Sequence, residues 1–232
     1  MNFDELIKSL DNIPVEENTL KDRSEWHKKR LGKLTSSRFD DMMQKGRGKE
    51  DKFGRSAMVY IYEKVAELLT NAPHEVTSKA MEWGTDMEAV AIARSEEITG
   101  LKVSPSDFYP LGEFAGGTPD GMVEDEKAAQ FSEGPEGIIE VKCPFNPANH
   151  AETLILNEVP EKHLFQIQGN LLVTGRWWCD FISYDPRVQE KSLQIFIKRV
   201  YRDEQIISAI QDRITEVSEK VKELFNQLKQ VK

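Results

Sequence analysis

Two short stretches of the sequence place acidic and basic side chains inside segments that otherwise favour β-strands. The first, GGTPDGMV, carries Asp120 after a Gly-Gly-Thr-Pro turn, and the second, GIIEVKCP, carries Glu140 and Lys142 between apolar residues. Residues i and i+2 of a strand share one face, so Glu140 and Lys142 point to the same side. The apolar residues between and beside them face the other side and anchor the strand, which leaves a carboxylate and an amine next to each other.

Strand pairing would bring a second carboxylate to this place. We expect residues 120–125 to pair with residues 137–142, joined by a loop over residues 125–136, so that Asp120 reaches Glu140. Two carboxylates at one point repel each other unless a cation lies between them. Mg²⁺ suits such a pair, because it prefers hard oxygen ligands, keeps several waters and is commonly held by one or two carboxylates together with a substrate phosphate.

Lys142 would complete a site for phosphodiester hydrolysis. Burial and nearby positive charge are expected to lower the pKa of its ammonium, which could then orient or deprotonate a metal-bound water. Metal-assisted hydrolysis needs a metal, an attacking water and stabilised charge on the phosphate. For the EVK segment alone, an exposed Glu–Lys pair on a half-buried strand is the commoner interpretation. The TPDG segment upstream favours the catalytic one.

The composition restricts the class of protein. The chain has 232 residues, of which 39% are hydrophobic, enough for the core of a single domain over residues 1–232. No run approaches the roughly 18 apolar residues of a membrane span, and residues 1–14 resemble an amphipathic helix rather than a signal peptide. Two cysteines, Cys143 and Cys179, are too few for a zinc knuckle or an iron–sulfur cluster and are typical of a reducing, intracellular setting.

The charge is unevenly distributed along the chain. The net charge is −9, but residues 21–55 contain 12 Lys/Arg and 6 Asp/Glu, a local +6 that leaves about −15 on the remainder. A basic patch on an acidic body can bind phosphate locally while the body repels non-specific contacts. From charge alone, a solvated helical surface is an equally good interpretation.

Local patterns predict helices on both sides of a β-rich middle. Helical periodicity and capping residues predict helices over about residues 25–32, 37–43, 52–70, 77–100, 147–157 and 160–175, with a polar loop at 44–51. Alternating patterns predict strands over about residues 101–105, 113–117, 120–125, 137–144, 177–185 and 192–201. The order indicates a mixed α/β fold with a helical part at 1–100, a sheet core at 101–200 and a long C-terminal helix at 203–231. Gly84 is a weak point of the helix 77–100, and Gly100 is its expected stop.

The C-terminal helix carries a heptad stripe. Its apolar residues are spaced alternately by three and four positions: Ile207, Ile210, Ile214, Val217, Val221, Leu224, Leu228 and Val231. Such a stripe can form a coiled-coil interface, but a terminal helix lying on its own domain needs a similar one. We favour the second interpretation.

The ordered set of motifs resembles a known family. Five segments occur in one order between about residues 24 and 187: WHKKRLGKLTSSRF, EWGTDMEAVA, GGTPDG, IIEVKCP and FQIQGNLLVTGRWWCDFISYDPR. The Pro119-Asp120 pair followed by Glu140-x-Lys142 resembles the PD-(D/E)XK nuclease motif. The full set resembles the lambda-exonuclease-like phage nucleases of the YqaJ viral recombinase type. This resemblance implies a restriction-endonuclease-like fold, with a central mixed β-sheet flanked by helices.

The resemblance also implies roles for the residues of the catalytic centre. Asp120 and Glu140 would hold the metal, with the Val141 carbonyl as a further ligand, and Lys142 would act on the attacking water. Glu88 matches the acidic residue that the family carries on a helix near the metal. Gln166 matches the glutamine that the family carries in the helix after Asp120, Glu140 and Lys142.

Other matched positions imply recognition of a DNA end. Arg30 and Ser37 match residues that bind the terminal 5′-phosphate, and Thr118 would supply a hydroxyl beside the metal site. His163 stands where relatives can carry a tyrosine, so a phosphate or base contact is only a hypothesis there. Basic side chains of the same region would line the path of the duplex: Lys28, Lys29, Lys33, Arg38, Lys45, Arg47 and Lys49.

The implied function is a Mg²⁺-dependent 5′→3′ exonuclease that degrades one strand of linear double-stranded DNA and leaves 3′ overhangs for phage recombination by single-strand annealing. Mn²⁺ would substitute for Mg²⁺, with two ions in each site. The family further implies a homotrimer, a single-strand annealing partner and a phage-encoded or prophage protein in the bacterial cytoplasm. Two alternatives stay open: another PD-(D/E)XK endonuclease, and a catalytically silent DNA-binding module, against which the intact Asp120, Glu140 and Lys142 argue.

Overall fold

A computed structural model describes residues 28–48, 51–73, 77–128 and 134–230. The expected amphipathic helix at residues 1–14 and the expected helix start at Ser24 lie outside these ranges, as do Lys49 and Val231. Residues 28–30 are helical, which agrees with the end of the helix expected over residues 25–32.

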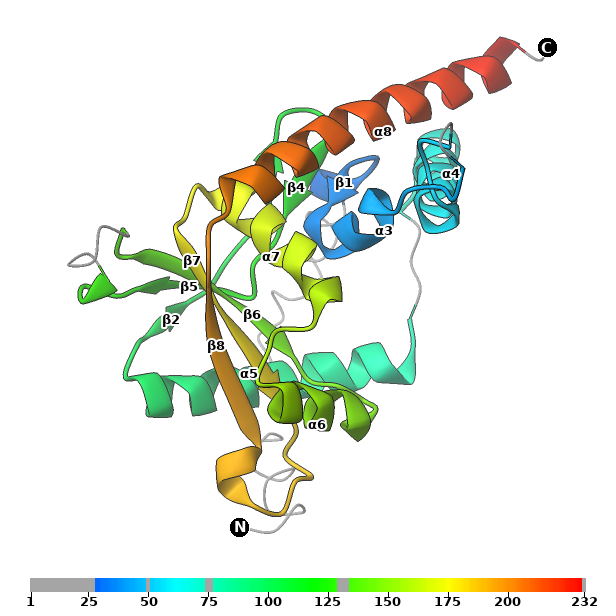
Figure 1. The fold of residues 1–232 in the computed structure, drawn as a ribbon. Coiled ribbons are helices and arrows are strands. Elements are labelled where there is room, and N and C mark those ends of the chain that lie inside the picture. The colour runs from blue at the N-terminus through cyan, green and yellow to red at the C-terminus, as the bar shows by residue number, and fades with distance from the viewer. Residues whose placement is uncertain (1–27, 49–50, 74–76, 129–133, 231–232) are drawn as a thin grey trace.

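The centre of the fold is a five-stranded mixed sheet (Figure 1). Its strands lie in the order β2 (Val103–Ser104), β5 (Gly121–Glu124), β6 (Glu136–Lys142), β7 (Trp178–Tyr184) and β8 (Ile195–Tyr201). The pair β6 and β7 is parallel, and the other neighbours are antiparallel. The predicted mixed sheet is therefore confirmed. Its two middle strands, β6 and β7, are almost entirely buried because helices cover both faces.

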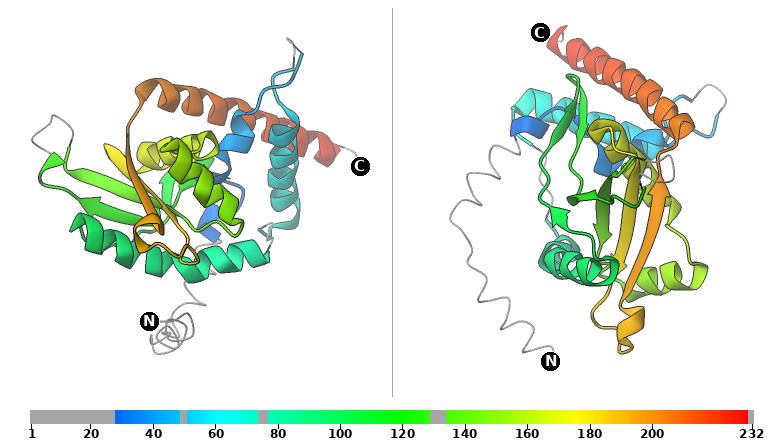
Figure 2. Two further views of the ribbon diagram at one scale, coloured as in Figure 1. Left: turned by 60° about the horizontal axis from the view of Figure 1, so that its bottom comes forward. Right: turned by 90° about the vertical axis from the view of Figure 1, so that its left-hand side faces the viewer.

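Helices on opposite faces of the sheet create two separate cores (Figure 2). Helix α5 (Lys79–Thr99) packs Met87 and Ala91 against one face, together with Ile139 of β6. Helix α7 (Glu161–Thr174) covers the other face, and α6 (Pro147–Leu156) lies on the same side. Ile138 belongs to the core under α7, so successive residues of β6 serve different cores, as the strand period requires.

A second, three-stranded sheet was not predicted as such. It consists of β1 (Leu34–Thr35), β4 (Ala115–Gly117) and β3 (Tyr109–Leu111), with β1 parallel and β3 antiparallel to β4. The strand expected at residues 113–117 is β4. Strand β1 has only two residues and pairs with a segment 81 positions away, so no local pattern could reveal it.

A helical lobe adjoins this small sheet. It contains the 3₁₀ turn η1 (Ser36–Arg38) and helices α3 (Phe39–Met43), α4 (Arg55–Thr70) and α8 (Glu204–Gln230). These elements and the small sheet share a third core that contains buried Leu34, Met42, Ile61 and Ala115. The short segment from β1 to η1 is thereby fixed between the lobe and the central sheet.

Helix α5 follows its sequence signals closely. Ser78 caps its start by accepting a hydrogen bond from the backbone N–H of Met81, and Gly100 ends it with a left-handed φ of 72°. The helix runs through Gly84 without interruption, because one glycine costs only about 1 kcal/mol in a helix interior. No helix in the described part of the chain is long and apolar enough to cross a membrane.

Helix α8 lies along the helical lobe (Figure 1), and most of its heptad stripe packs on the domain itself, as favoured from the sequence. Ile207, Ile210 and Val217 are at most 2% exposed, whereas Leu228 near the helix end is 52% exposed. The buried portion of the stripe contacts the core of the helical lobe. Because these residues are buried within one chain, the stripe is not available along its whole length for a coiled-coil interface with another chain.

This packing predicts that two apolar residues of α8 contribute differently to the free energy of unfolding. Ile210→Ala should lower the free energy of unfolding by about 2–5 kcal/mol, because it leaves a cavity in the core. Leu228→Ala is the matched control and should change it by less than about 0.5 kcal/mol. Urea denaturation of both variants measures the difference. Equal losses would mean that the stripe acts between chains rather than within one.

Candidate active site

The paired strands β5 and β6 bring Asp120 to Glu140. The antiparallel register places Gly121 opposite Ile139, and the Asp120 N–H donates to the Ile139 carbonyl at 3.2 Å. The Asp120 carboxylate in turn accepts a hydrogen bond at Oδ2 from the Val141 N–H at 2.6 Å. The expected pairing is confirmed, and the carboxylate of Asp120 is held against the backbone of the strand that carries Glu140.

The Glu140 carboxylate is buried and has a separate partner for each oxygen. Its side chain is 0% exposed. Lys142 Nζ donates to Oε1 at 2.5 Å, and Asn170 Nδ2 of α7 donates to Oε2 at 3.0 Å. Glu140 and Lys142 share one face of β6 as predicted, while Ile139 and Val141 pack in the opposite core under α5.

The acidic cluster changes the pKa of its own members. Burial raises the pKa of Asp120 well above its ordinary value, and the charges of Glu140 and Glu88 raise it further. The Lys142 ammonium and the hydrogen bond from the Val141 N–H oppose this rise. The chain thus concentrates more negative charge at this point than its own cation neutralises, which is the condition under which a bound cation is stabilising.

The sequence predicted a lowered pKa for Lys142, and for the chain by itself this prediction was wrong. Burial does lower the pKa of the Lys142 ammonium, but the carboxylates of Glu140, Asp120 and Glu88 outweigh burial, and the pKa is raised. The sequence argument counted burial and positive neighbours and left out the sum of three nearby negative charges. Within the chain alone, Lys142 is therefore a firmly protonated hydrogen-bond donor.

Glu88 approaches the same point from α5. It is only partly exposed, and burial and the charge of Glu140 raise its pKa, whereas Lys142 lowers it. Glu82 and Asp86 on the same helix are exposed, and Glu96 caps the backbone N–H of Val103 instead. Of these acidic residues, Glu88 is the one that shares an electrostatic environment with Glu140.

The two glutamines of α7 have different surroundings. Gln168 is buried and holds the chain after β8, because its amide donates to the Tyr201 carbonyl and accepts from the Asp203 N–H. Gln166 is half-buried. It lies one turn before Asn170, so the two residues share the helix face that looks towards Glu140. The matched residue is therefore on the site face, and its neighbour Gln168 is structural.

His163 lies beside Lys142 as a neutral ring. A pocket next to the carboxylate cluster is lined by Lys142, His163, Lys162 and Phe181, among others. The rings of His163 and Phe181 stack with centroids 5.6 Å apart. Burial, with Lys142 and Lys162, lowers the pKa of His163 to about 3. In the chain by itself the His163 ring is therefore neutral, and its contact with a phosphate or base stays a prediction.

The residues matched to the 5′-phosphate site gather around Tyr60 of α4. Thr35 donates its N–H to the Tyr60 hydroxyl at 2.8 Å, and the hydroxyls of Thr35 and Ser37 lie 3.4 Å apart. Burial lowers the pKa of Arg30, while Tyr60 and Glu67 raise it. Arg30 is thus partly buried against α4, near the hydroxyls of this segment.

A buried lysine at this place was missed from the sequence. Lys64 of α4 is 7% exposed, and its Nζ donates to Glu67 Oε1 at 2.7 Å. Glu67 also accepts the Gly32 N–H at 3.0 Å. Burial, together with Arg30, lowers the pKa of Lys64. Glu67 also acts on the charge of Arg30, so two cationic side chains and a carboxylate lie together around Tyr60.

Thr118 and the basic side chains expected to contact DNA differ in whether they have partners within the chain. The Thr118 hydroxyl is buried and has no hydrogen-bond partner among the described residues, which is unusual for a buried hydroxyl and leaves it available to a ligand. Lys28 and Arg47 are exposed. Arg38 instead pairs with Asp41 and Glu63, so it is committed within the chain rather than open to a duplex.

The two carboxylates fit Mg²⁺ only together with substrate and water. Within the described residues, no three Asp, Glu, His or Cys side chains converge closely enough to hold a metal ion by themselves. Asp120 and Glu140 nevertheless supply hard oxygens at one point, and the Val141 carbonyl belongs to the residue that binds Asp120. Two carboxylates are a common set of protein ligands for Mg²⁺ in sites that also bind a substrate phosphate.

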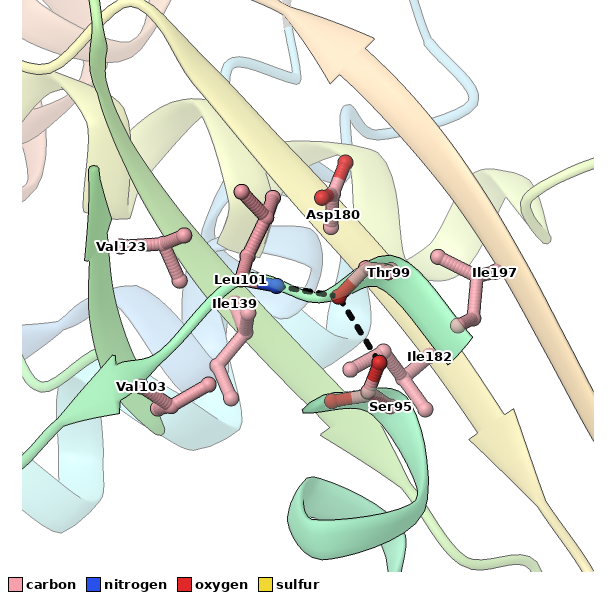
Figure 3. Close-up of a pocket in the computed structure, with 9 residues that line it drawn as sticks. All are labelled: Ser95, Thr99, Leu101, Val103, Val123, Ile139, Asp180, Ile182 and Ile197. Atoms are coloured by element: carbon pink, nitrogen blue, oxygen red, sulfur yellow. Dashed lines mark hydrogen bonds between the residues drawn. The ribbon is translucent and has the colours of Figure 1, made fainter. Parts of the chain in front are cut away.

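A second small cavity lies under α5, away from this cluster (Figure 3). Its walls are mostly aliphatic, including Val123, Ile182 and Ile197. The one acidic side chain, Asp180, is paired by both oxygens with Arg199. The cavity is therefore a packing defect between helix and sheet, with no free group for chemistry.

The residues missed from the sequence share one property. Ser36, Lys64, Glu67 and Asn170 are buried polar side chains whose partners lie in other elements or one helix turn away. Lys64 and Glu67 are an i,i+3 pair of opposite charge, which is the only local signal among them. Nothing local marks Ser36 and Asn170, which are 134 residues apart.

Solved structures of two exonucleases resemble this chain over most of its length. The alkaline exonuclease LHK-Exo from Laribacter hongkongensis is 32% identical to this chain, with a TM-score of 0.76 over 89% of this chain and 96% of that one. Its complex with dAMP matches equally well. A phage-related exonuclease from Haemophilus somnus 129PT shares the fold at 16% identity, with a TM-score of 0.65 over 84% of this chain and 96% of that one. No curated protein matches the chain.

The family follows from the sequence itself. Residues 25–177 match the YqaJ-like viral recombinase domain. The chain belongs to this family, as the resemblance predicted, and the matched region contains Asp120, Glu140, Lys142 and Gln166.

The neutral state of His163 makes a prediction about stability. An unfolded imidazole has a pKa near ~6.5, whereas that of folded His163 is about 3. The unfolded chain therefore takes up this proton first as the pH falls, so stability decreases below about pH 6.5. Between pH 7 and pH 5 the loss should reach up to about 2 kcal/mol. His163→Phe, which keeps a ring on Phe181, should lose correspondingly less in urea titrations at the two pH values; an identical loss in both proteins would contradict the assignment.

Proposed function

We propose that this chain is a Mg²⁺-dependent exonuclease that degrades one strand of linear double-stranded DNA from its 5′ ends and leaves 3′ overhangs. The observation that carries the proposal is the cluster of buried Glu140 with the partly exposed Asp120 and Lys142, at the end of two paired strands. The 32% identity to an alkaline exonuclease over 89% of the chain supports the class of reaction.

The chain's own residues would divide the work of hydrolysis. Asp120 and Glu140 would hold Mg²⁺, with the Val141 carbonyl as a further ligand. A bound divalent ion supplies an activated water and stabilises charge on the phosphate. The raised pKa of Asp120 supports cation binding, because a cation at this point favours the ionised carboxylate.

Lys142 would stabilise the reacting phosphate and orient the attacking water. Its ammonium is fixed by Glu140 on the face of β6 where the substrate would lie. Because three carboxylates raise its pKa, it acts first as a donor, and it could release a proton only once nearby positive charge lowers that pKa. Glu88 and Gln166 would contact the metal-bound waters or the phosphate from α5 and α7.

Recognition of the 5′ end would use the pocket around Tyr60. Arg30 offers a planar fork of donors for phosphate, and Lys64 adds a second cation held by Glu67. The unpartnered hydroxyl of Thr118 and the exposed Ser37 supply further donors. Thr118 is two residues from Asp120, so a terminal phosphate in this pocket would leave the next phosphodiester close to the carboxylates.

Contacts along the duplex would be independent of sequence. Exposed basic side chains such as Lys28, Lys45 and Arg47 can bind backbone phosphates, which adds affinity without reading bases. The acidic remainder of the chain would limit binding elsewhere. A homotrimer around the DNA and a single-strand annealing partner that takes over the 3′ overhang complete the proposal, in the setting of phage recombination.

The reaction itself is tested with 5′-phosphorylated linear duplex and Mg²⁺. The Lys142→Ala variant should lose about 10²–10⁴-fold in rate of nucleotide release, because it removes the charged donor beside the phosphate. Lys162→Ala is the matched control, since Lys162 is an exposed lysine in the same pocket, and it should keep most of the rate. Chelation of the metal should abolish release.

Other substrates separate the alternatives. Covalently closed circles should remain intact, and nucleotides should appear only from ends. Cleavage of closed circles would indicate an endonuclease of the same superfamily. Binding to linear duplex without cleavage under any metal would indicate a silent DNA-binding module, and full activity of Lys142→Ala would disprove the proposed chemistry.

End recognition makes a separate prediction. Arg30→Ala should erase the preference for a 5′-phosphate over a 5′-hydroxyl, because the guanidinium contacts only the phosphorylated end. Arg47→Ala removes an exposed arginine of the same basic segment and should weaken binding to both ends alike. Initial rates on the two substrates measure the ratio. An unchanged ratio in Arg30→Ala would mean that the 5′-phosphate binds elsewhere.

A further inference from the structure

A chain of three buried side chains connects the segment after β1 to the catalytic strand. Ser36 Oγ donates to Asn170 Oδ1 at 2.6 Å, and Asn170 Nδ2 donates to Glu140 Oε2 at 3.0 Å. Ser36 is 2% exposed, and Asn170 and Glu140 are both 0% exposed. These residues come from η1, α7 and β6, so the connection exists only in the folded chain.

The chemistry of the three groups leaves one arrangement. An ionised carboxylate can only accept hydrogen bonds, so the amide of Asn170 must present its NH₂ to Glu140. Its carbonyl oxygen then faces η1 and needs a donor, which is the hydroxyl of Ser36. A reversed amide would place oxygen against oxygen at Glu140. Glu140 thus determines which way the Asn170 amide faces, Ser36 holds that amide in place by donating to its oxygen, and Asn170 in turn holds the carboxylate.

The backbone of β4 and of α7 packs closely against the Ser36–Asn170 contact. A Cβ atom at Gly117 of β4 would lie 2.4 Å from Asn170 Oδ1 and 2.7 Å from Ser36 Oγ. A Cβ atom at Gly169 would lie 2.5 Å from the ring of Phe39 and 3.3 Å from Ser36 Cβ. Both glycines let backbone approach the pair directly, so the Ser36–Asn170 contact is enclosed from β4 and α7 alike.

We propose that Ser36 and Asn170 are a positioning pair that orients Glu140 towards the metal and ties it to the phosphate-binding segment. With Oε2 held by Asn170, Oε1 of the carboxylate faces Lys142, whose side chain is 28% exposed. Ser36 stands between Thr35 and Ser37, whose hydroxyls lie in the proposed 5′-phosphate pocket. The inference rests on the proposed metal-dependent function.

The pair should affect metal affinity rather than the chemical step. Groups that hold a metal ligand by hydrogen bonds typically contribute 10- to 100-fold in metal affinity or activity. Asn170→Ala should therefore weaken Mn²⁺ binding by about 10- to 100-fold. Ser36→Ala should weaken Mn²⁺ binding less than Asn170→Ala does. The double variant should bind Mn²⁺ almost as well as Asn170→Ala alone, because Ser36 acts through Asn170.

The experiment is calorimetric titration of the intact protein with Mn²⁺ in the absence of DNA. Gln168→Ala is the matched control, because Gln168 is a buried amide of the same helix that binds only the Tyr201 and Asp203 backbone. It should lower the melting temperature and keep the wild-type affinity for Mn²⁺. Ser36→Ala provides a gentler test should Asn170→Ala fold poorly.

A kinetic measurement separates positioning from catalysis. Excess Mg²⁺ should restore most of the nuclease rate of Asn170→Ala and should not restore that of Lys142→Ala. Mn²⁺ affinity of Asn170→Ala within twofold of wild type, or an equal loss in Gln168→Ala, would overturn the positioning role while leaving the nuclease function intact. No Mn²⁺ binding by the wild-type protein would overturn the metal-dependent function and this inference together.

Discussion

The buried carboxylate of Glu140 is the group on which the rest of the site depends. A charge removed from water is costly unless other groups replace the lost hydration. In this fold Lys142 supplies an ammonium from the same strand and Asn170 supplies an amide from α7. The central sheet, the helix above it and the segment after β1 are all required to keep that charge inside the protein.

The region around Glu140 holds more negative charge than its one cation, Lys142, neutralises. Burial and the charge of Glu140 raise the pKa of both Asp120 and Glu88. A protein selected only for stability would separate these groups or pair each with its own cation. A cation at this point would relieve the repulsion that the chain leaves in place, which is the basis of the proposed metal site.

Basic side chains lie at the other end of the segment that reaches Glu140. Lys64 pairs with Glu67 near Tyr60, and Glu67 and Tyr60 also act on the charge of Arg30. The segment from Thr35 to Ser37 links these residues to the carboxylates, because Thr35 binds Tyr60 and Ser36 reaches Glu140 through Asn170. Cationic side chains and a carboxylate cluster are therefore connected by one short segment in a protein whose net charge is −9.

Much of the catalytic centre could be predicted from local sequence. The alternation of apolar and charged residues around Glu140 and Lys142 determines which side of β6 each occupies, because the strand period is fixed at two residues. The turn before Asp120 and the apolar pattern after it predict the neighbouring strand, and helix periodicity with Ser78 and Gly100 predicts α5. These features depend on near neighbours along the chain, so the sequence expresses them directly.

Other features depend on which distant segments meet. The small sheet pairs Leu34 with Ala115, and the Ser36–Asn170 contact spans 134 positions, so no local pattern marks either. The direction of the pKa shift of Lys142 likewise follows from three carboxylates on separate elements. The sequence by itself determined the residue types, their faces and the order of the elements. Tertiary structure alone decided the electrostatic balance and the hydrogen-bond partners of the buried polar groups, because both depend on distances between groups far apart in the chain.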